Sequence, residues 1–512
     1  MPKLIPIYTW DKGVIKFNRN STRLSKKPWF QGALLMLCVL IAMLLANLPF
    51  TADGYRRVLE TSIQLHLFSA DGSFNLLFPR DLTVEKFIND ILMVVFFFTV
   101  GLEIKREITG GELSSLKKAL LPVIAAFGGV ITPALIYTLV NHGTASAGGW
   151  GIPTATDIAF AICILSALGR KVPVSLKVFL TALAIADDLI AILVVALFYG
   201  GKVNLVLLVA ALGVVLITIL LRALGEKRMF PYLVCALFVW ILFYYSGIHA
   251  TMSGVVMAFL IPSKPRYNKS QYIHKRDHFI KMLETHDAID DEPFPNGPQK
   301  HFLRKLESIA HGTMDMSYRV DHALSPWVNF LIMPIFALAN AGVKIPDPSL
   351  FNIFAGPELA NLAAGVGTAT GAAGAGLAGA AGAAALGNVS LGIFLGLVIG
   401  KPLGITLFSW IAIKTGLAEM PKNASWPMFI AVACLGGIGF TMSIFVNGLA
   451  FSDPGLVDIG KISILLTSTT AALCGLLAVS LTCKGKARKL TADQILPQNK
   501  TKVKTNNNIQ AL

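Results

Sequence analysis

The stretch SLKVFLTALAIADDLIAILVVALFYG (residues 175–200) decides the fold class, because it is long, apolar and carries two adjacent aspartates near its middle. At 1.5 Å per residue such a run is long enough to cross the ~30 Å hydrocarbon core of a bilayer. Apolar runs of about 20 residues recur along most of the chain. These runs predict an all-α polytopic membrane protein. They exclude an outer-membrane barrel, whose segments alternate over about 10 residues.

The composition agrees with a membrane protein. Of the 512 residues 54% are hydrophobic and 14% are charged, whereas soluble domains carry about 25% charge. The net charge of +15 comes from basic residues in tails and loops, which is typical of topology signals and gives no reason to expect a nucleic-acid partner. The six cysteines are scattered without metal-ligand spacing, so we expect packing roles for them and no cofactor.

The apolar runs predict about twelve transmembrane helices. Their approximate bounds are 30–49, 86–104, 118–140, 150–168, 174–199, 203–221, 230–246, 248–262, 327–345, 390–412, 427–449 and 460–482. Lys and Arg gather in the loops after even-numbered spans and in both tails. The positive-inside rule therefore places both termini in the cytoplasm, which requires an even number of spans.

This topology divides the chain into seven segments. They are a basic cytoplasmic tail (1–29), spans one to eight (30–262), a polar cytoplasmic loop (263–326), span nine (327–345), an Ala/Gly-rich low-complexity linker (346–389), spans ten to twelve (390–482) and a second basic cytoplasmic tail (483–512). The uncharged part of the linker could pass for a thirteenth span, but an odd count would place the basic C-terminal tail outside.

Four ionisable residues lie inside apolar spans at similar depth. Asp157 lies within span four, Asp187 and Asp188 at the middle of span five, and Lys401 at the middle of span ten. A charge at the bilayer centre costs several kcal/mol and usually marks a substrate or proton pathway. A buried ion pair that only fixes helix packing would account for Lys401 and one acid, and would leave two carboxylates unexplained.

The spacing of the paired aspartates predicts different partners for them. Neighbouring helical positions point about 100° apart, so Asp187 and Asp188 cannot both face one group. One can pair with Lys401 while the other faces a cation. Two carboxylates, Thr156 and free backbone carbonyls would form a transient site for Na⁺ or Li⁺, because hard cations prefer oxygen ligands.

Two spans carry residues that interrupt helices. Span four holds Pro153, and span eleven holds Gly436, Gly437 and Gly439. Interrupted helices at corresponding positions of two halves indicate a transporter site.

At these residues the chain resembles the NhaA family of Na⁺/H⁺ antiporters, and the resemblance covers all the expected spans. The matching strings are NDILMVVFFFTVGLEIKRE (89–107), GIPTATDIAFA (151–161), ALAIADDLIAI (182–192), SGIHATMSGVV (246–256), SPWVNFLIMPIFALANAGV (325–343), IGKPLGI (399–405) and GGIGFTMSIF (436–445). The resemblance implies that Asp188 is the principal ion and proton carrier and that Asp187 is a proton carrier paired with Lys401. It also implies inverted-topology repeats with two crossing broken helices, one of which carries Asp157 to balance helix-end dipoles, and it implies that Thr156 lies near the ion.

The resemblance further implies a set of residues linked to pH sensing. These are Glu103, Lys105, Arg106 and Glu107 at the end of span two, His249, and Asp321 with His322 before span nine. His249 has the alternative of a packed interfacial histidine. Ser325 stands where the family often has a second histidine, and the 263–326 loop is longer than is typical.

The function that follows is secondary active, pH-activated and electrogenic Na⁺(Li⁺)/H⁺ antiport, exporting Na⁺ for pH and sodium homeostasis. The protein is then a transporter and no enzyme. It is expected in a bacterial inner membrane, in contact with lipid, and a hairpin within 50–85 would support a homodimer. An anion symporter of similar architecture is disfavoured by the midplane acids, and a cation channel by Lys401. An intramembrane aspartyl protease would need Tyr-Asp and Gly-x-Gly-Asp motifs, but Asp157 follows Thr156 and Asp187 follows Ala186.

Overall fold

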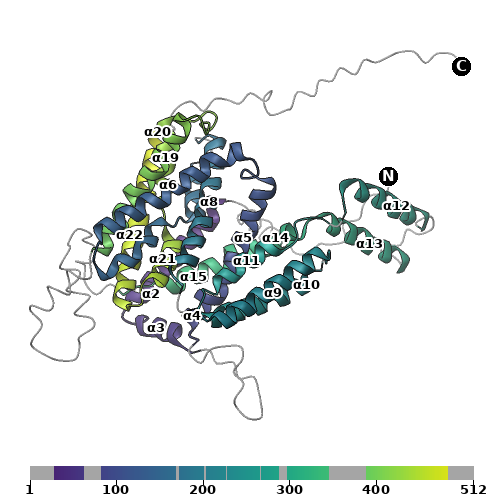
Figure 1. Cartoon of the computed structure of the whole chain (residues 1–512), viewed down its shortest axis with the longest axis horizontal. Helices are drawn as coiled ribbons and strands as arrows, with labels where there is room; N and C mark the ends of the chain where they lie inside the picture. Colours follow the sequence, from purple (N-terminus) through teal and green to yellow (C-terminus); the bar gives the residue numbers. More distant parts are fainter. Residues whose placement is uncertain are drawn as a thin grey trace, which may run out of the picture.

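The computed structural model describes residues 28–62, 82–168, 172–200, 203–226, 228–265, 267–286, 297–344 and 388–482. In this part of the chain the regular structure is helical, apart from one β-bridge between Ser62 and Thr83. Figure 1 shows the helices gathered into a bundle, with α12 and α13 projecting from it. The helices are α2 (Pro28–Asn47), α3 (Ala52–Glu60), α4 (Val84–Phe87), η1 (Ile88–Leu92), α5 (Met93–Gly110), α6 (Leu116–Val140), η2 (Ala145–Thr154), α7 (Ile158–Ala167), α8 (Val174–Phe198), α9 (Leu205–Ala223), α10 (Met229–Ser246), α11 (Thr251–Leu260), α12 (Lys269–His286), α13 (Gly297–Thr313), α14 (Met316–Trp327), η4 (Val328–Ile332), α15 (Met333–Asn340), α18 (Val389–Phe394), η6 (Leu395–Gly400), α19 (Lys401–Lys414), α20 (Trp426–Leu435), α21 (Phe440–Ala450) and α22 (Pro454–Thr482).

These helices confirm an all-α polytopic membrane protein. Within the described residues, ten helices are long and apolar enough to cross a membrane, and α20 with α21 forms an eleventh span bent by 50°. The shorter apolar helix α11 lies where span eight was expected. Each of the twelve expected spans therefore has a helical counterpart.

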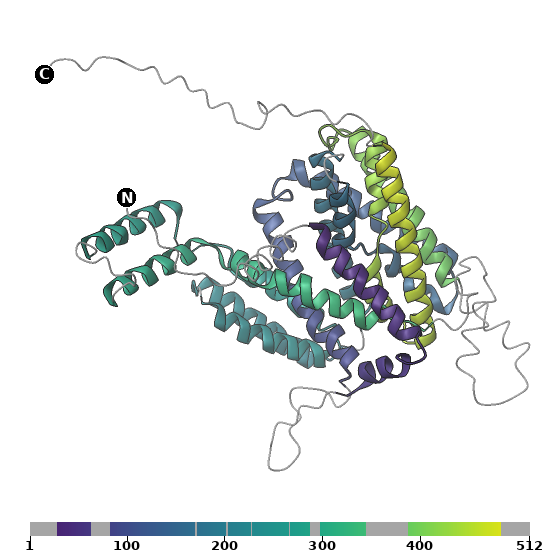
Figure 2. The same ribbon diagram turned by 180° about the vertical axis from the view of Figure 1, so that it is seen from behind.

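The bundle contains two groups of helices. In one, which we call the α5 group, α5, α9, α10, α11 and α14 pack on one another. In the other, the α8 group, α6, α8, α19, α20 and α22 pack together, and α5 touches α8 across the boundary. Figure 2 shows the same bundle from behind, where α2 lies beside α15. Asp188 of α8 lies at the boundary between the two groups, because it lines one cavity together with Glu103 and Arg106 of α5.

One boundary differs from the sequence expectation. Span nine was expected to begin at residue 327, but its helix begins at Met316. Its first turns carry Asp321 and Ser325, which line a cavity, so their polarity hides this part of the span from a hydropathy pattern. The 263–326 loop contains α12 and α13, whereas the expected linker (346–389) lies outside the described residues except at its last two positions.

Candidate ion-exchange site

The two interrupted spans cross and touch through their backbones. Span four changes from the 3₁₀ helix η2 to α7 through an extended stretch at residues 155–157. Span eleven breaks between α20 and α21. The backbone N–H of Asp157 donates to the carbonyl of Ile438 over 2.7 Å, so each break satisfies a polar group of the other. Gly437 lies against a third span, since a Cβ there would collide with the carbonyl of Leu397 in η6.

Asp157 is a capping residue with both carboxylate oxygens satisfied. Its Oδ1 accepts from the N–H of Phe160 over 3.3 Å, at the start of α7. Its Oδ2 accepts from the N–H of Thr441 over 3.2 Å and from the Thr441 hydroxyl. A carboxylate at two helix N-termini is favourable because it faces their positive dipole ends. This placement suits a dipole-balancing residue, and it removes Asp157 from the two carboxylates that sequence reasoning left unexplained.

Lys401 lies between Asp187 and the end of η2. Its Nζ is 2.8 Å from Oδ2 of Asp187 and also donates to the carbonyl of Thr154. The side chains are 1% and 2% exposed, so the pair is fully desolvated. The ammonium faces the negative dipole end of η2. Lys401 begins α19 directly after the π-helical segment η6, a kind of helix distortion that is frequent at functional sites.

Thr156 belongs to the same cluster. Its hydroxyl lies 2.5 Å from Oδ2 of Asp187 and 3.1 Å from the carbonyl of Gly436. The space beside Asp187 and Lys401 is only about 10 Å³, which is about the least that holds one water. In this conformation Asp187 is therefore engaged with Thr156 and Lys401, and no ion-sized space adjoins the Asp187–Lys401 pair. Thr156 also lines a larger cavity, the one that Asp188 faces.

Asp188 faces a different environment. Its side chain is 3% exposed, and its Oδ1, like Oδ1 of Asp187, has no hydrogen-bond partner among the described residues. It lines a cavity of about 280 Å³, the acid cavity, together with Asp157 and Thr441 at the broken spans. An unpartnered buried carboxylate is costly, so it is a natural position for a cation or a proton. The 100° step along α8 thus turns Asp187 to Lys401 and Asp188 to the acid cavity.

Charged residues of the α5 group line the acid cavity at its more exposed parts. Arg106 Nη1 lies 3.0 Å from Oδ2 of Asp321, and Arg106 Nη2 lies 3.8 Å from Oε1 of Glu103. Arg106 and Glu103 are 48% and 41% exposed, in contrast to Asp188. Ser325 donates to Oδ1 of Asp321 over 3.0 Å. We call Glu103, Arg106 and Asp321 the charged rim.

The other residues that the resemblance links to pH sensing do not line the acid cavity. Glu107 lies 4.0 Å from Arg106. Lys105 points instead to α11, where its ammonium donates to the carbonyls of Ala258, Phe259 and Ile261. The exposed His322 contacts the ring of Tyr318. His249 lies before α11, with Nε2 2.5 Å from the carbonyl of Tyr199.

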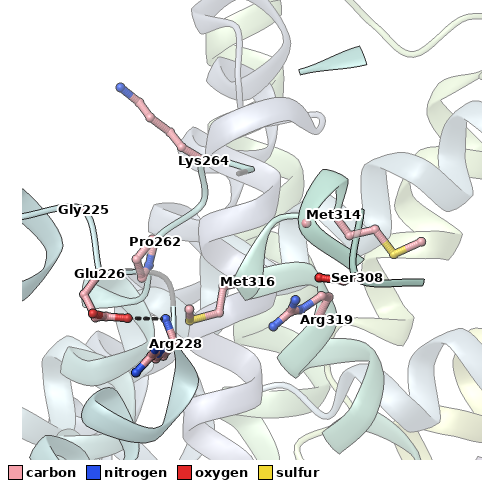
Figure 3. A pocket seen from close by; sticks show the side chains of 10 residues that line it. Gly225, Glu226, Arg228, Pro262, Lys264, Ser308, Met314, Met316 and Arg319 are labelled. Carbon is pink, nitrogen blue, oxygen red and sulfur yellow. Dashed lines mark hydrogen bonds between the residues drawn. The ribbon is translucent and has the colours of Figure 1, made fainter. Parts of the chain in front are cut away.

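A larger cavity of about 360 Å³ lies elsewhere (Figure 3). It is formed where the α9–α10 turn meets α13 and α14, and Arg228 and Arg319 are among its lining residues. The N–H of Arg228 donates to Glu226 over 2.8 Å. This cavity contains none of the membrane-embedded aspartates, so the acid cavity remains the candidate ion site.

Sequence reasoning missed two partners of the site. Thr441, which binds Asp157, stands in the GGIGFTMSIF string, but a hydroxyl there gives no distinct signal. The carbonyl of Thr154, which binds Lys401, belongs to the backbone and is invisible in a residue pattern.

This helical membrane protein has two crossing broken spans, a buried Lys–Asp pair and a buried carboxylate oxygen without a partner among the described residues. These features are those of a secondary ion transporter. Comparison with known proteins gives the family. The family described as "Na+/H+ antiporter 1" matches residues 22–375 and 368–479. The chain is 38% identical over 455 residues to "Na(+)/H(+) antiporter NhaA" of Oleidesulfovibrio alaskensis, covering 89% of this chain and 92% of the relative. It is 39% identical over 445 residues to the protein of that name from Sulfurimonas denitrificans, covering 87% and 91%. The chain therefore belongs to the NhaA family of Na⁺/H⁺ antiporters.

Proposed function

We propose that this protein exchanges Na⁺ (or Li⁺) for protons at Asp188, with Asp187 and Lys401 as the coupled partner pair. The observation that carries the proposal is the buried, unpartnered Oδ1 of Asp188 on the acid cavity. Family membership supports antiport as the overall reaction. Na⁺ and H⁺ are then substrates that occupy the same carboxylate in turn.

The coupling follows from charge arithmetic at these residues. Na⁺ bound at Asp188 neutralises one negative charge and excludes a proton from that carboxylate. After Na⁺ leaves, Asp188 takes up one proton, and Asp187 takes up a second when its pair with Lys401 opens. Two protons then enter for each Na⁺ exported, so each cycle moves one net charge inward and is driven by the membrane potential as well as by the proton gradient.

Everted membrane vesicles test the function directly. With a proton gradient imposed, addition of Na⁺ to wild-type vesicles is expected to discharge the gradient, whereas K⁺ at the same concentration does not. Electrogenic exchange should accelerate when the potential favours net charge movement. No Na⁺-dependent discharge in vesicles that contain the folded protein would contradict the proposal.

Activity is expected to rise with pH across the neutral to alkaline range. At low pH protons occupy the carboxylates and exclude Na⁺, and raising the pH frees them. The charged rim would sharpen the response, because Arg106 interacts with both Glu103 and Asp321. The measurement is the initial exchange rate from about pH 6 to 9, and a flat profile would contradict competition between the two ions.

We also propose that the protein lies in the inner membrane with both tails in the cytoplasm and that it forms a homodimer.

Deletion of residues 362–386 tests the proposed linker, because this stretch holds none of the site residues and no ionisable group. We expect transport to persist with a lower yield at worst. A reporter fused to the C-terminal tail should stay cytoplasmic. Inversion of the reporter would show that the stretch is a span.

A further inference from the structure

The end of α8 carries a tyrosine that the exchange mechanism does not use. Tyr199 follows α8 directly, eleven residues beyond Asp188, which is about 16 Å along the helix. Its hydroxyl accepts from the N–H of Gly151 over 2.8 Å and donates to the carbonyl of Gly148 over 2.9 Å. The Tyr199 hydroxyl therefore binds the backbone of η2 at two points.

The backbone of η2 is fitted closely to this phenol. A Cβ at Gly151 would lie 2.5 Å from the Tyr199 oxygen. The Tyr199 ring lies 6.2 Å from the ring of Trp150, with the two planes 31° apart. On the other side of η2, the hydroxyl of Tyr137 donates to the carbonyl of Ser146 over 3.0 Å. Side chains, and not a continuous α-helix, therefore fix the position of η2.

The position of η2 matters to the ion site because η2 ends at the Asp187–Lys401 pair, and the residues just after it, Thr156 and Asp157, line the acid cavity. The last residue of η2, Thr154, provides the carbonyl that binds Lys401, and Thr156 binds Asp187 two residues later. Tyr199 therefore connects α8 to η2 at one end, and Thr156 with Asp187 connects them at the ion site. Helix α8 is therefore joined to the broken span four at two points, one at Tyr199 and one at Asp187.

We propose that Tyr199 is a positioning residue for Na⁺/H⁺ exchange, whose hydroxyl holds η2 so that Thr154 and Thr156 keep Lys401 and Asp187 in the binding geometry. The inference rests on the proposed exchange at Asp188. Without the hydroxyl, η2 can take up more positions relative to α8, and the fraction of molecules whose site can bind Na⁺ falls. The apparent affinity for Na⁺ falls by the same factor.

The phenol can hold η2 at every working pH. A tyrosine hydroxyl ordinarily loses its proton only near pH 10, so the Tyr199 hydroxyl keeps its proton across the range of the exchange assay. His249 also binds the Tyr199 backbone carbonyl, which a change of the side chain leaves in place. Loss of the hydroxyl should thus change affinity without changing the shape of the pH profile.

The test is Tyr199→Phe, which keeps the ring and removes both hydrogen bonds. Loss of one to two hydrogen bonds predicts about a five- to tenfold rise in the Na⁺ concentration for half-maximal exchange, with the maximal rate and folded yield within about twofold of wild type. Tyr245→Phe is the matched control, because the Tyr245 side chain is 43% exposed and its hydroxyl has no hydrogen bond within the described ranges.

Each other outcome overturns the inference. An unchanged half-maximal concentration means that the hydroxyl does not position the site. A lower yield without a change in that concentration assigns Tyr199 a purely structural role. Wild-type exchange measured beside the variants separates these results from failure of the proposed function, which would abolish exchange in the wild type and the control as well.

Discussion

Asp188→Asn is expected to abolish Na⁺/H⁺ exchange while leaving the protein folded. An asparagine amide cannot take up a proton in this range and offers no charge to a cation. The side chain is buried on the acid cavity, and its Oδ1 has no partner in the described structure. Removing an unpartnered buried charge also relieves a desolvation cost, so the melting temperature in detergent should stay the same or rise.

The control makes the same chemical change at an exposed position. Asp277 lies on α12 with its side chain 50% exposed, and Asp277→Asn should exchange Na⁺ like the wild type. Exchange rates in everted vesicles, normalised to folded protein, are the measurement. Near-normal exchange by Asp188→Asn would remove Asp188 from the site and direct attention to Asp187.

Asp187→Asn and Lys401→Ala are each expected to destabilise the protein strongly. The double variant is expected to lose much less stability than the sum of the two single losses. The pair is buried, with Nζ and Oδ2 2.8 Å apart. Removing one partner of such a pair leaves an uncompensated charge, at about 3–5 kcal/mol. Once the first partner is gone, removing the second also removes that charge. The two aspartates should thus behave oppositely, with Asp187→Asn destabilising and Asp188→Asn neutral or stabilising.

A double-mutant cycle on thermal stability in detergent measures this coupling. The interaction energy should reach a few kcal/mol, in the range expected for charges that contact each other. Losses that simply add would show that the pair does not hold in the folded protein in solution. Asp157 would not then be the obvious replacement partner, since Thr441 and the N–H of Phe160 already satisfy its carboxylate.

The sequence predicts the helical class, the spans and the membrane-embedded charges, because each depends on local composition and length. It also predicts that Asp187 and Asp188 diverge, since helical geometry alone requires it. It could not predict which oxygen each charge contacts. The capping of Asp157 by Thr441 and the contact of Lys401 with the Thr154 carbonyl depend on how distant segments cross. The early start of span nine was hidden because its polar face lines a cavity.

The contact between the two broken spans also bears on how freely this protein can change its sequence. The bond from the N–H of Asp157 to the carbonyl of Ile438 uses main-chain atoms alone. Nineteen of the twenty standard residues could supply that N–H, and only proline lacks it. That bond can therefore survive a change of side chain at position 157 or 438, whereas the caps that the Asp157 carboxylate forms at the same crossing cannot. The main-chain contact thus leaves the side chains around it open to selection for a different ion or a different pH range.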